Sequence, residues 1–78
     1  MNSMYLDFVL ETAKKVFATE DIDPDTRFRE DLNAKSLSIA QLMSAIEDEY
    51  DVEVPYMDIS RKKTIAEVAD FIQALLED

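Results

Sequence analysis

Residues 28–55, FREDLNAKSLSIAQLMSAIEDEYDVEVP, contain the pattern that decides the fold of this chain. From Ser36 to about Tyr50, the apolar residues fall on one broad face of a helix: Leu37, Ile39, Leu42, Met43, Ile46 and Tyr50. This spacing is typical of an amphipathic helix, and Ser36 is well placed as its N-cap because a serine oxygen can accept from unpaired first-turn amides. Alternating residues 52–54 and Pro55 then predict a short extended connector.

The same helical period appears on both sides of this stretch. It predicts a first helix from about Ser3 to Ala18, followed by an acidic, solvated loop over residues 20–25. Residues 56–59 indicate one short helical turn. Residues 64–67 have the Thr-x-x-Glu form of a capping box, so a final helix should start near Thr64. We therefore expect an all-α fold, a small four-helix bundle with three main helices and one short helix, formed by residues 1–78 as a single domain.

The core of this bundle must be small, because 78 residues are roughly half of a typical domain. Hydrophobic residues make up 47% of the chain and charged residues 33%, a balance that fits a globular domain and not a disordered acidic tail. The apolar positions expected in the core are Phe8, Val16, Phe28, Leu32, Leu42, Ile46, Val54, Ile65, Val68, Phe71 and Ile72. Some of these could also line a cavity, but packing alone accounts for each of them.

Composition excludes most catalytic chemistry. The chain has no cysteine and no histidine, so it lacks thiol nucleophiles, thiolate metal ligands and the commonest general base. Glycine is absent as well, which argues against Gly-rich phosphate loops. We therefore do not expect an enzyme.

Charge indicates the kind of partner. Eight Lys and Arg against 18 Asp and Glu give a net charge of −10, which repels nucleic acids and anionic lipids and favours basic protein surfaces. No apolar run is long enough to span a bilayer, and Asp7 and Glu11 interrupt the start of the chain where a signal peptide needs apolar residues. We expect a cytoplasmic monomer that binds neither nucleic acid nor membrane.

Two acidic clusters could suggest a calcium site or acid–base catalysis, but neither has the residues that such a site needs. Asp21, Asp23 and Asp25 have the spacing that opens a calcium loop, but Thr26 and Leu32 stand where that loop needs glycine and glutamate. Residues 47–53 contain five carboxylates, with no nucleophile beside them. We expect this run to be a solvated, mutually repelling face that binds a basic partner and reduces stability at low salt.

Ser36 is the most informative residue, because it lies between a polar loop and an apolar helix. On physical grounds alone, capping is the favoured role, since the chain holds no base that could activate this hydroxyl. Any chemistry at Ser36 would have to be supplied by another protein.

The sequence around Ser36 resembles the acyl carrier protein family. The similarity runs through residues 28–37, FREDLNAKSL, continues with Leu42 and the segment 45–55, AIEDEYDVEVP, and covers the last helix at residues 64–72. The family pattern is F-x-x-D-L-G-x-D-S-L, followed by a helix and an acidic, aromatic and E-[IV]-P segment. The resemblance therefore covers most of the chain in register.

The resemblance implies a role for Ser36 beyond capping. In the family, a phosphopantetheinyl transferase attaches the phosphopantetheine arm of coenzyme A to the matching serine, and the thiol of the arm carries an acyl group as a thioester. Modification then becomes the favoured reading of Ser36. The resemblance also implies that Leu37 helps to dock enzymes with basic surfaces, together with the acidic residues Glu47, Asp48 and Glu49 of the recognition helix.

This chain departs from the family pattern at four positions near the serine. Asn33 replaces the usual glycine, Lys35 replaces the aspartate before the serine, and Ser38 and Gln41 replace residues that are commonly acidic. The partner-facing surface, which includes Lys35 and Gln41, is therefore less acidic at this end. These differences favour a specialised carrier for fatty acid, lipid or polyketide biosynthesis. The alternatives are an unmodified scaffold module that binds basic partners and a carrier of aminoacyl units.

Overall fold

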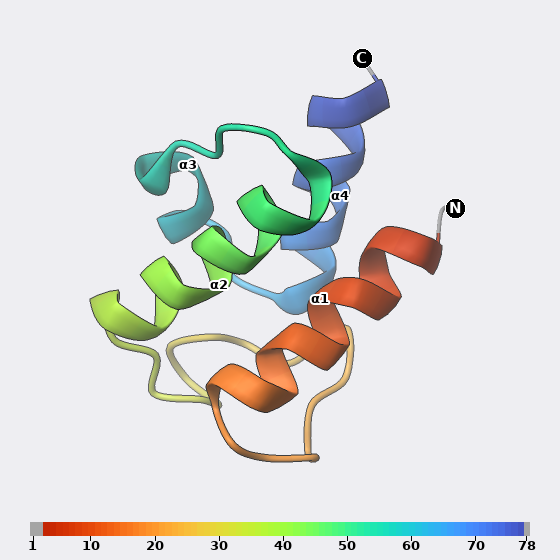
Figure 1. Cartoon of the computed structure of the whole chain (residues 1–78). Helices are drawn as coiled ribbons and strands as arrows, with labels where there is room; N and C mark the ends of the chain where they lie inside the picture. Colours follow the sequence, from red (N-terminus) through yellow and green to blue (C-terminus); the bar gives the residue numbers. More distant parts are fainter. Residues whose placement is uncertain (1–2, 78) are drawn as a thin grey trace.

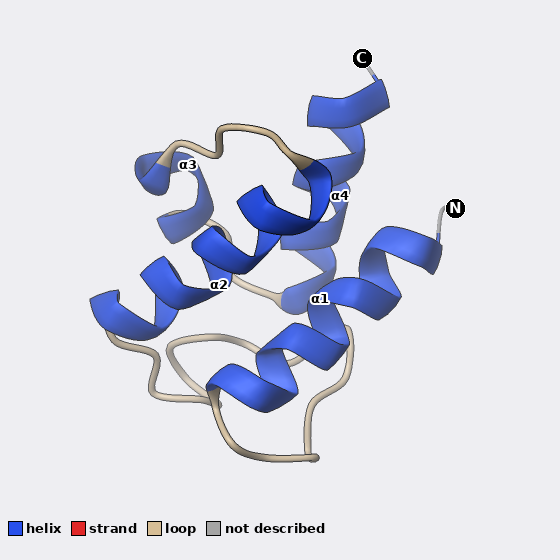
Figure 2. Ribbon diagram, in the orientation of Figure 1, coloured by secondary structure: helices blue, strands red, loops and turns tan. Residues whose placement is uncertain are grey.

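Four helices make up the ordered architecture of the computed structural model, which describes residues 3–77. They are α1 (Ser3–Val16), α2 (Ser36–Tyr50), α3 (Tyr56–Ser60) and α4 (Ile65–Glu77). Helix α1 packs against both α4 and α2, and the short α3 packs against α2 (Figure 1). Figure 2 shows that the connection over residues 17–35 is the longest non-helical part of the chain. The expected all-α fold with three long helices and one short helix is confirmed.

The ends of the helices follow from local chemistry. At the end of α1, the Thr19 amide donates to the Lys14 carbonyl at 3.1 Å, and Ala18 between them is left-handed with φ 54°. This is a Schellman-type stop in which alanine occupies the position that glycine usually takes, and it ends the helix at Val16, two residues before the expected Ala18.

One of the two hydrogen bonds of the predicted capping box is present at the start of α4. The Glu67 amide donates to Thr64 Oγ1 at 3.2 Å, as expected for an N-cap threonine. The Glu67 carboxylate accepts instead from the Lys63 amide at 2.9 Å, one residue before the usual donor. The helix begins at Ile65, so the predicted start near Thr64 is correct.

The core differs from the expected one along α1. Seven predicted core residues are buried: Phe28, Leu42, Ile46, Val54, Ile65, Val68 and Ile72. Phe8, Leu32 and Phe71 are only partly buried against the core, and Val16 is half-buried. The apolar stripe of α1 is wider than its contact surface, and Tyr5, Val9 and Ala13 face inward instead. Ile22, Ile39, Ile59 and Ala69 complete the core and were not expected there.

The long connection is held against the start of α4 by backbone hydrogen bonds. The Phe28 amide donates to the Lys63 carbonyl at 2.9 Å, and the Ile65 amide donates to the Thr26 carbonyl at 3.2 Å. Phe28 is 2% exposed, so its ring anchors this segment in the core. Residues 29–35 therefore run from the anchored Phe28 directly to the start of α2.

The acidic loop has an internal structure of its own. The Asp23 carboxylate accepts from the Asp25 amide at 2.8 Å, and the Asp23 amide donates to Thr26 Oγ1 at 2.8 Å. Such local bonds are typical of Asx turns and account for Asp23 without a ligand. Across residues 3–77, none of the helices is both long enough and apolar enough to cross a bilayer.

Candidate functional site

Ser36 is the first residue of α2, and its side chain is exposed. The N-cap position belongs to Lys35, which is extended at φ −106° and ψ 169°, and no side-chain hydrogen bond caps the helix. The expectation that Ser36 caps α2 is therefore wrong, because the extended backbone of Lys35 makes the helix begin at Ser36 itself. The first turn contains no acidic side chain. Its amides thus remain suited to an anion.

The segment before Ser36 is shaped by a left-handed residue. Asn33 has a left-handed backbone with φ 53°. The family pattern has glycine at this position, and asparagine is one of the few other residues that tolerate a left-handed conformation. The Ala34 amide then donates back to the Phe28 carbonyl at 2.9 Å. Lys35 Nζ donates to Asn33 Oδ1 at 3.4 Å. The substitution of asparagine for glycine is therefore compatible with the turn that presents Ser36.

A charged pair stabilises the same segment. The Arg27 amide donates to Asp31 Oδ2 at 2.8 Å, and Arg27 Nη2 lies 3.3 Å from Asp31 Oδ1. These bonds lower the pKa of Asp31 below its ordinary value: the bond from the Arg27 amide has the larger effect, and the bond from the Arg27 guanidinium has the next largest. Asp31 thus remains ionised and holds the turn that precedes Ser36.

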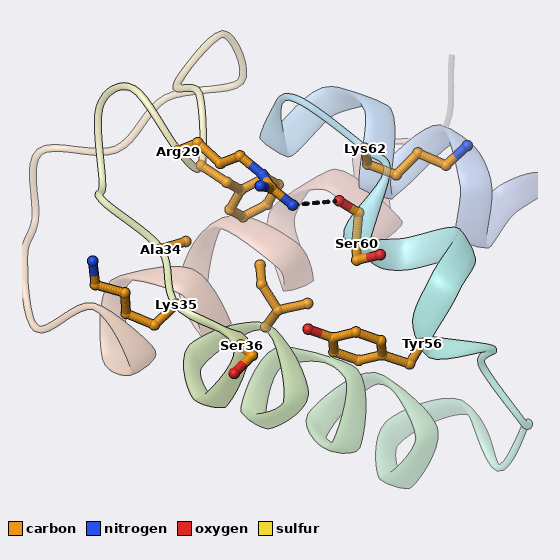
Figure 3. A pocket seen from close by; sticks show the side chains of 9 residues that line it. Arg29, Ala34, Lys35, Ser36, Tyr56, Ser60 and Lys62 are labelled. Atoms are coloured by element: carbon orange, nitrogen blue, oxygen red, sulfur yellow. Dashed lines mark hydrogen bonds between the residues drawn. The ribbon is translucent and has the colours of Figure 1, made fainter.

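A hollow of about 190 Å³ lies beside Ser36 (Figure 3). Its apolar side is formed by Phe28 and Ile39, and its polar side includes Arg29 and Tyr56. Arg29 Nη2 donates to the Ser60 carbonyl at 3.4 Å, which bridges the hollow from the long connection to the end of α3. The sequence did not point to Arg29, Tyr56 or Ser60 as residues of the site. The run of three basic residues at 61–63 in an acidic chain is a signal that could have indicated it, since Lys62 also lines the hollow.

The exposed side of α2 carries several of the residues predicted to bind partners. Leu37 is 69% exposed, and Gln41 and Asp48 are exposed as well. Their spacings of four and seven residues place all three on one face of the helix. Glu49 is also exposed but lies about a third of a turn away from this face. The structure thus places Leu37, Gln41 and Asp48 along one exposed face of α2.

Glu47 occupies a different environment from its acidic neighbours. It is half-buried, and its Oε2 accepts a hydrogen bond from the Val54 amide at 2.8 Å. This bond fixes the connector between α2 and α3 to the last turns of α2. The expectation that the whole acidic run is solvated is therefore wrong for Glu47, because its carboxylate satisfies a backbone donor.

The end of α2 far from Ser36 is an aromatic junction. The Tyr50 ring makes edge contacts with Tyr5 and Phe8, at centroid distances of 5.5 and 5.4 Å. The Tyr5 hydroxyl donates to Glu77 Oε2 at 3.0 Å, joining α1 to α4. Burial raises the pKa of both Tyr5 and Tyr50, and the bond to Glu77 raises that of Tyr5 further. Both tyrosines therefore stay neutral, and the junction is structural.

The geometry at Ser36 suits the attachment of a group to its hydroxyl. The hydroxyl is accessible at a helix start that favours phosphate, with a hollow beside it. The chain contains neither histidine nor cysteine that could activate this hydroxyl.

Comparisons with known proteins agree with this geometry. Residues 7–72 match the sequence profile of the family described as "Phosphopantetheine attachment site". An acyl carrier protein of Thermosynechococcus vestitus is 39% identical over 70 residues, which are 82% of this chain and 86% of the relative. One of Helicobacter hepaticus is 37% identical over 54 residues, covering 69% of this chain and 71% of the relative.

A solved structure has a similar fold. It is a proposed acyl carrier protein from Mycobacterium tuberculosis, which superimposes with a TM-score of 0.80 over 92% of this chain and 99% of its own. At 23% sequence identity, this similarity concerns the fold alone.

Proposed function

The chain belongs to the acyl carrier protein family and carries its phosphopantetheine attachment site, and on this premise we propose that Ser36 is the residue to which the arm is joined. Acyl carrier proteins are carriers and not catalysts. The observation that supports the proposal is the exposed Ser36 at the uncapped start of α2. The thiol of the attached arm would carry the acyl group as a thioester, which accounts for the absence of cysteine from the chain.

The residues around Ser36 fit the phosphate of such an arm. The first-turn amides of α2 have no side-chain cap, and the positive end of a helix favours a phosphate. Arg29 and Lys35 add positive charge at the rim of the hollow. No acidic side chain lies in the first turn to repel the group.

Modification requires a phosphopantetheinyl transferase. In the reaction, Ser36 Oγ forms a bond to the pantetheine-bearing phosphorus of coenzyme A, the pyrophosphate P–O bond breaks, and the nucleotide leaves. The transferase would supply the base that accepts the Ser36 proton, since this chain has no histidine. Its use of coenzyme A makes a cytoplasmic location part of the proposal.

Partner enzymes would dock on α2. We assign this role to Leu37, Gln41 and Asp48 on the exposed face of the helix, and to Glu49 beside them. Long-range attraction from a chain of charge −10 would steer basic enzymes toward this surface. Glu47 is part of the same predicted set, and it also has the structural bond to Val54.

Within the family, the departures near Ser36 favour a specialised carrier in fatty acid, lipid or polyketide biosynthesis. Lys35 presents a positive charge directly before the attachment residue, where many transferases would meet an aspartate in other members. A dedicated pathway with its own enzymes accommodates that difference more readily than general fatty acid synthesis does. An aminoacyl cargo and an unmodified scaffold are the competing functions.

Mass spectrometry of the intact protein tests the proposal. Incubation with coenzyme A and a broad-specificity transferase should add one phosphopantetheine to the wild type and none to Ser36→Ala. Ser38→Ala, which alters a second serine of α2, is the matched control and should still gain one arm. An unchanged wild-type mass with several transferases would refute the proposal and favour the scaffold.

A further inference from the structure

The positive charges of this acidic chain are gathered near Ser36. Five of its eight Lys and Arg residues line two neighbouring hollows: Arg29, Lys35, Arg61, Lys62 and Lys63. Within residues 3–77, none of these five makes an ion pair, although the chain has 18 carboxylates. Cations left unpaired in such a chain are available to an anion from outside.

The two hollows form one continuous surface. The hollow beside Ser36 has a volume of about 190 Å³, and the second has about 440 Å³. They share Arg29, Ser60 and Lys62, so the second hollow adjoins the one beside Ser36. Among the described residues, Glu30 is the only one with a carboxylate that lines either of these two hollows.

Arg29 and Tyr56 are the donors best placed to bind an anion. Arg29 uses one of its five N–H groups in a long bond of 3.4 Å to the Ser60 carbonyl. The Tyr56 hydroxyl points into the same hollow (Figure 3) and makes no hydrogen bond within residues 3–77. The Ser60 hydroxyl, in contrast, already donates to the Met57 carbonyl at 3.0 Å.

The other cations are oriented elsewhere. Lys35 Nζ donates to Asn33, and Lys62 Nζ lies 5.2 Å from the centre of the Phe71 ring. Arg29 is therefore the centre of the site, and the remaining cations contribute to its field. Its position is fixed by the preceding residue, Phe28, whose buried ring and backbone bond to Lys63 hold the chain there.

We propose that this surface binds the negatively charged free end of the acyl group carried on Ser36. The inference rests on the proposed function and names its cargo class, an acyl group with a second carboxylate. A guanidinium can give a carboxylate two parallel N–H bonds, and the Tyr56 hydroxyl is a further donor that lines the same hollow. A hydrocarbon end would instead cover these polar groups without satisfying them.

The size of the first hollow agrees with a short cargo. A cavity of about 150 Å³ holds a molecule the size of benzene. The 190 Å³ beside Ser36 thus suits a short acyl end, while the bundle interior is filled by side chains such as Leu42, Ile46 and Ile59, each at most 1% exposed.

Loading the ¹⁵N-labelled carrier with matched acyl groups tests the inference. A broad-specificity transferase would join the arm from succinyl-coenzyme A or from 4-oxopentanoyl-coenzyme A, in which a methyl group replaces one carboxylate oxygen. The succinyl form should shift the Arg29 Nε–Hε resonance and the amides of residues 60–63, whereas the neutral form should resemble the unloaded arm. The shifts should fall in about 1 M salt, where the Debye length is about 3 Å.

Three variants and one peptide complete the experiment. Arg29→Gln should abolish the difference between the two acyl groups at residues 60–63, and Tyr56→Phe should reduce it. Lys15→Gln, which removes an exposed cation that lines neither hollow, should preserve it. A hexaglutamate peptide added to the unloaded carrier represents the rival occupant, an acidic partner surface.

The possible failures are distinguishable by mass and by resonance. Equal shifts from both acyl groups, or no shift from the succinyl group on a carrier that has gained the arm, would overturn this inference and leave the proposed function intact. Shifts from hexaglutamate without shifts from succinyl would assign the surface to an acidic partner and also overturn it. If the carrier gains no arm at all, both the proposed function and this inference are refuted.

Discussion

Replacing Glu47 should destabilise the domain, whereas replacing its acidic neighbours should not. The Glu47 carboxylate accepts from the Val54 amide at 2.8 Å, and Val54 is only 4% exposed. Glu47→Ala leaves this donor without its partner beside the core. A hydrogen bond to a charged group contributes about 1.5–3 kcal/mol, so the loss should be of that size.

This loss is large for so small a domain. A bundle of this length has a net stability of about 3–5 kcal/mol. In a domain of 60–100 residues, each kcal/mol changes the thermal midpoint by about 4–8 °C, so Glu47→Ala should lower it by roughly 6–24 °C. Glu47→Gln keeps an acceptor oxygen and should lose about 1 kcal/mol or less, because a neutral hydrogen bond is weaker and like-charge repulsion is relieved.

Thermal and urea denaturation followed by circular dichroism provide the measurement. Glu49→Ala is the matched control, since Glu49 is exposed on the same helix and the substitution changes helix propensity equally. It should change stability by a few tenths of a kcal/mol at most. Added monovalent salt should raise the midpoint of the wild type by screening the repulsion among residues 47–53. If Glu47→Ala and Glu49→Ala have equal midpoints, the bond to Val54 does not stabilise the fold and our reasoning is wrong.

Three further predictions each concern a single residue. Lys35→Asp should speed modification by a transferase of general fatty acid metabolism at low salt, through an attraction of up to about 1 kcal/mol, and equal initial rates for both variants would contradict it. Because the pKa of Asp31 is lower in the folded chain than in the unfolded chain, the stability from its bonds to Arg27 is present above about pH 4 and lost as the pH falls through the folded value; Asp31→Asn should flatten this part of the pH–stability curve. Ala18→Gly should stabilise the domain by about 1 kcal/mol because it relieves the left-handed φ of 54°, whereas Ala13→Gly, inside α1, should destabilise it in the same denaturation assay.

The sequence by itself determined where the helices lie, and it singled out Ser36, the residue that we propose for attachment. Apolar spacing placed α2 at its observed bounds, and the Thr-x-x-Glu pattern placed the start of α4, because both signals depend on residues within a few positions of one another. The motif around Ser36 pointed to the family that the comparisons then showed. Such local information needs no knowledge of the packing.

Only the tertiary structure decided which faces and charges meet. The stripe of α1 did not reveal that Val9 is fully buried and Phe8 only partly buried, since this depends on where α2 and α4 lie against it. Glu47 could not be separated from its acidic neighbours, because its partner Val54 comes close only after the chain turns back beyond α2. Arg29 lies 31 residues before Ser60, and their contact beside Ser36 arises only when the long connection pairs with the start of α4. Contacts between residues so distant along the chain depend on the complete packing, which no local pattern encodes.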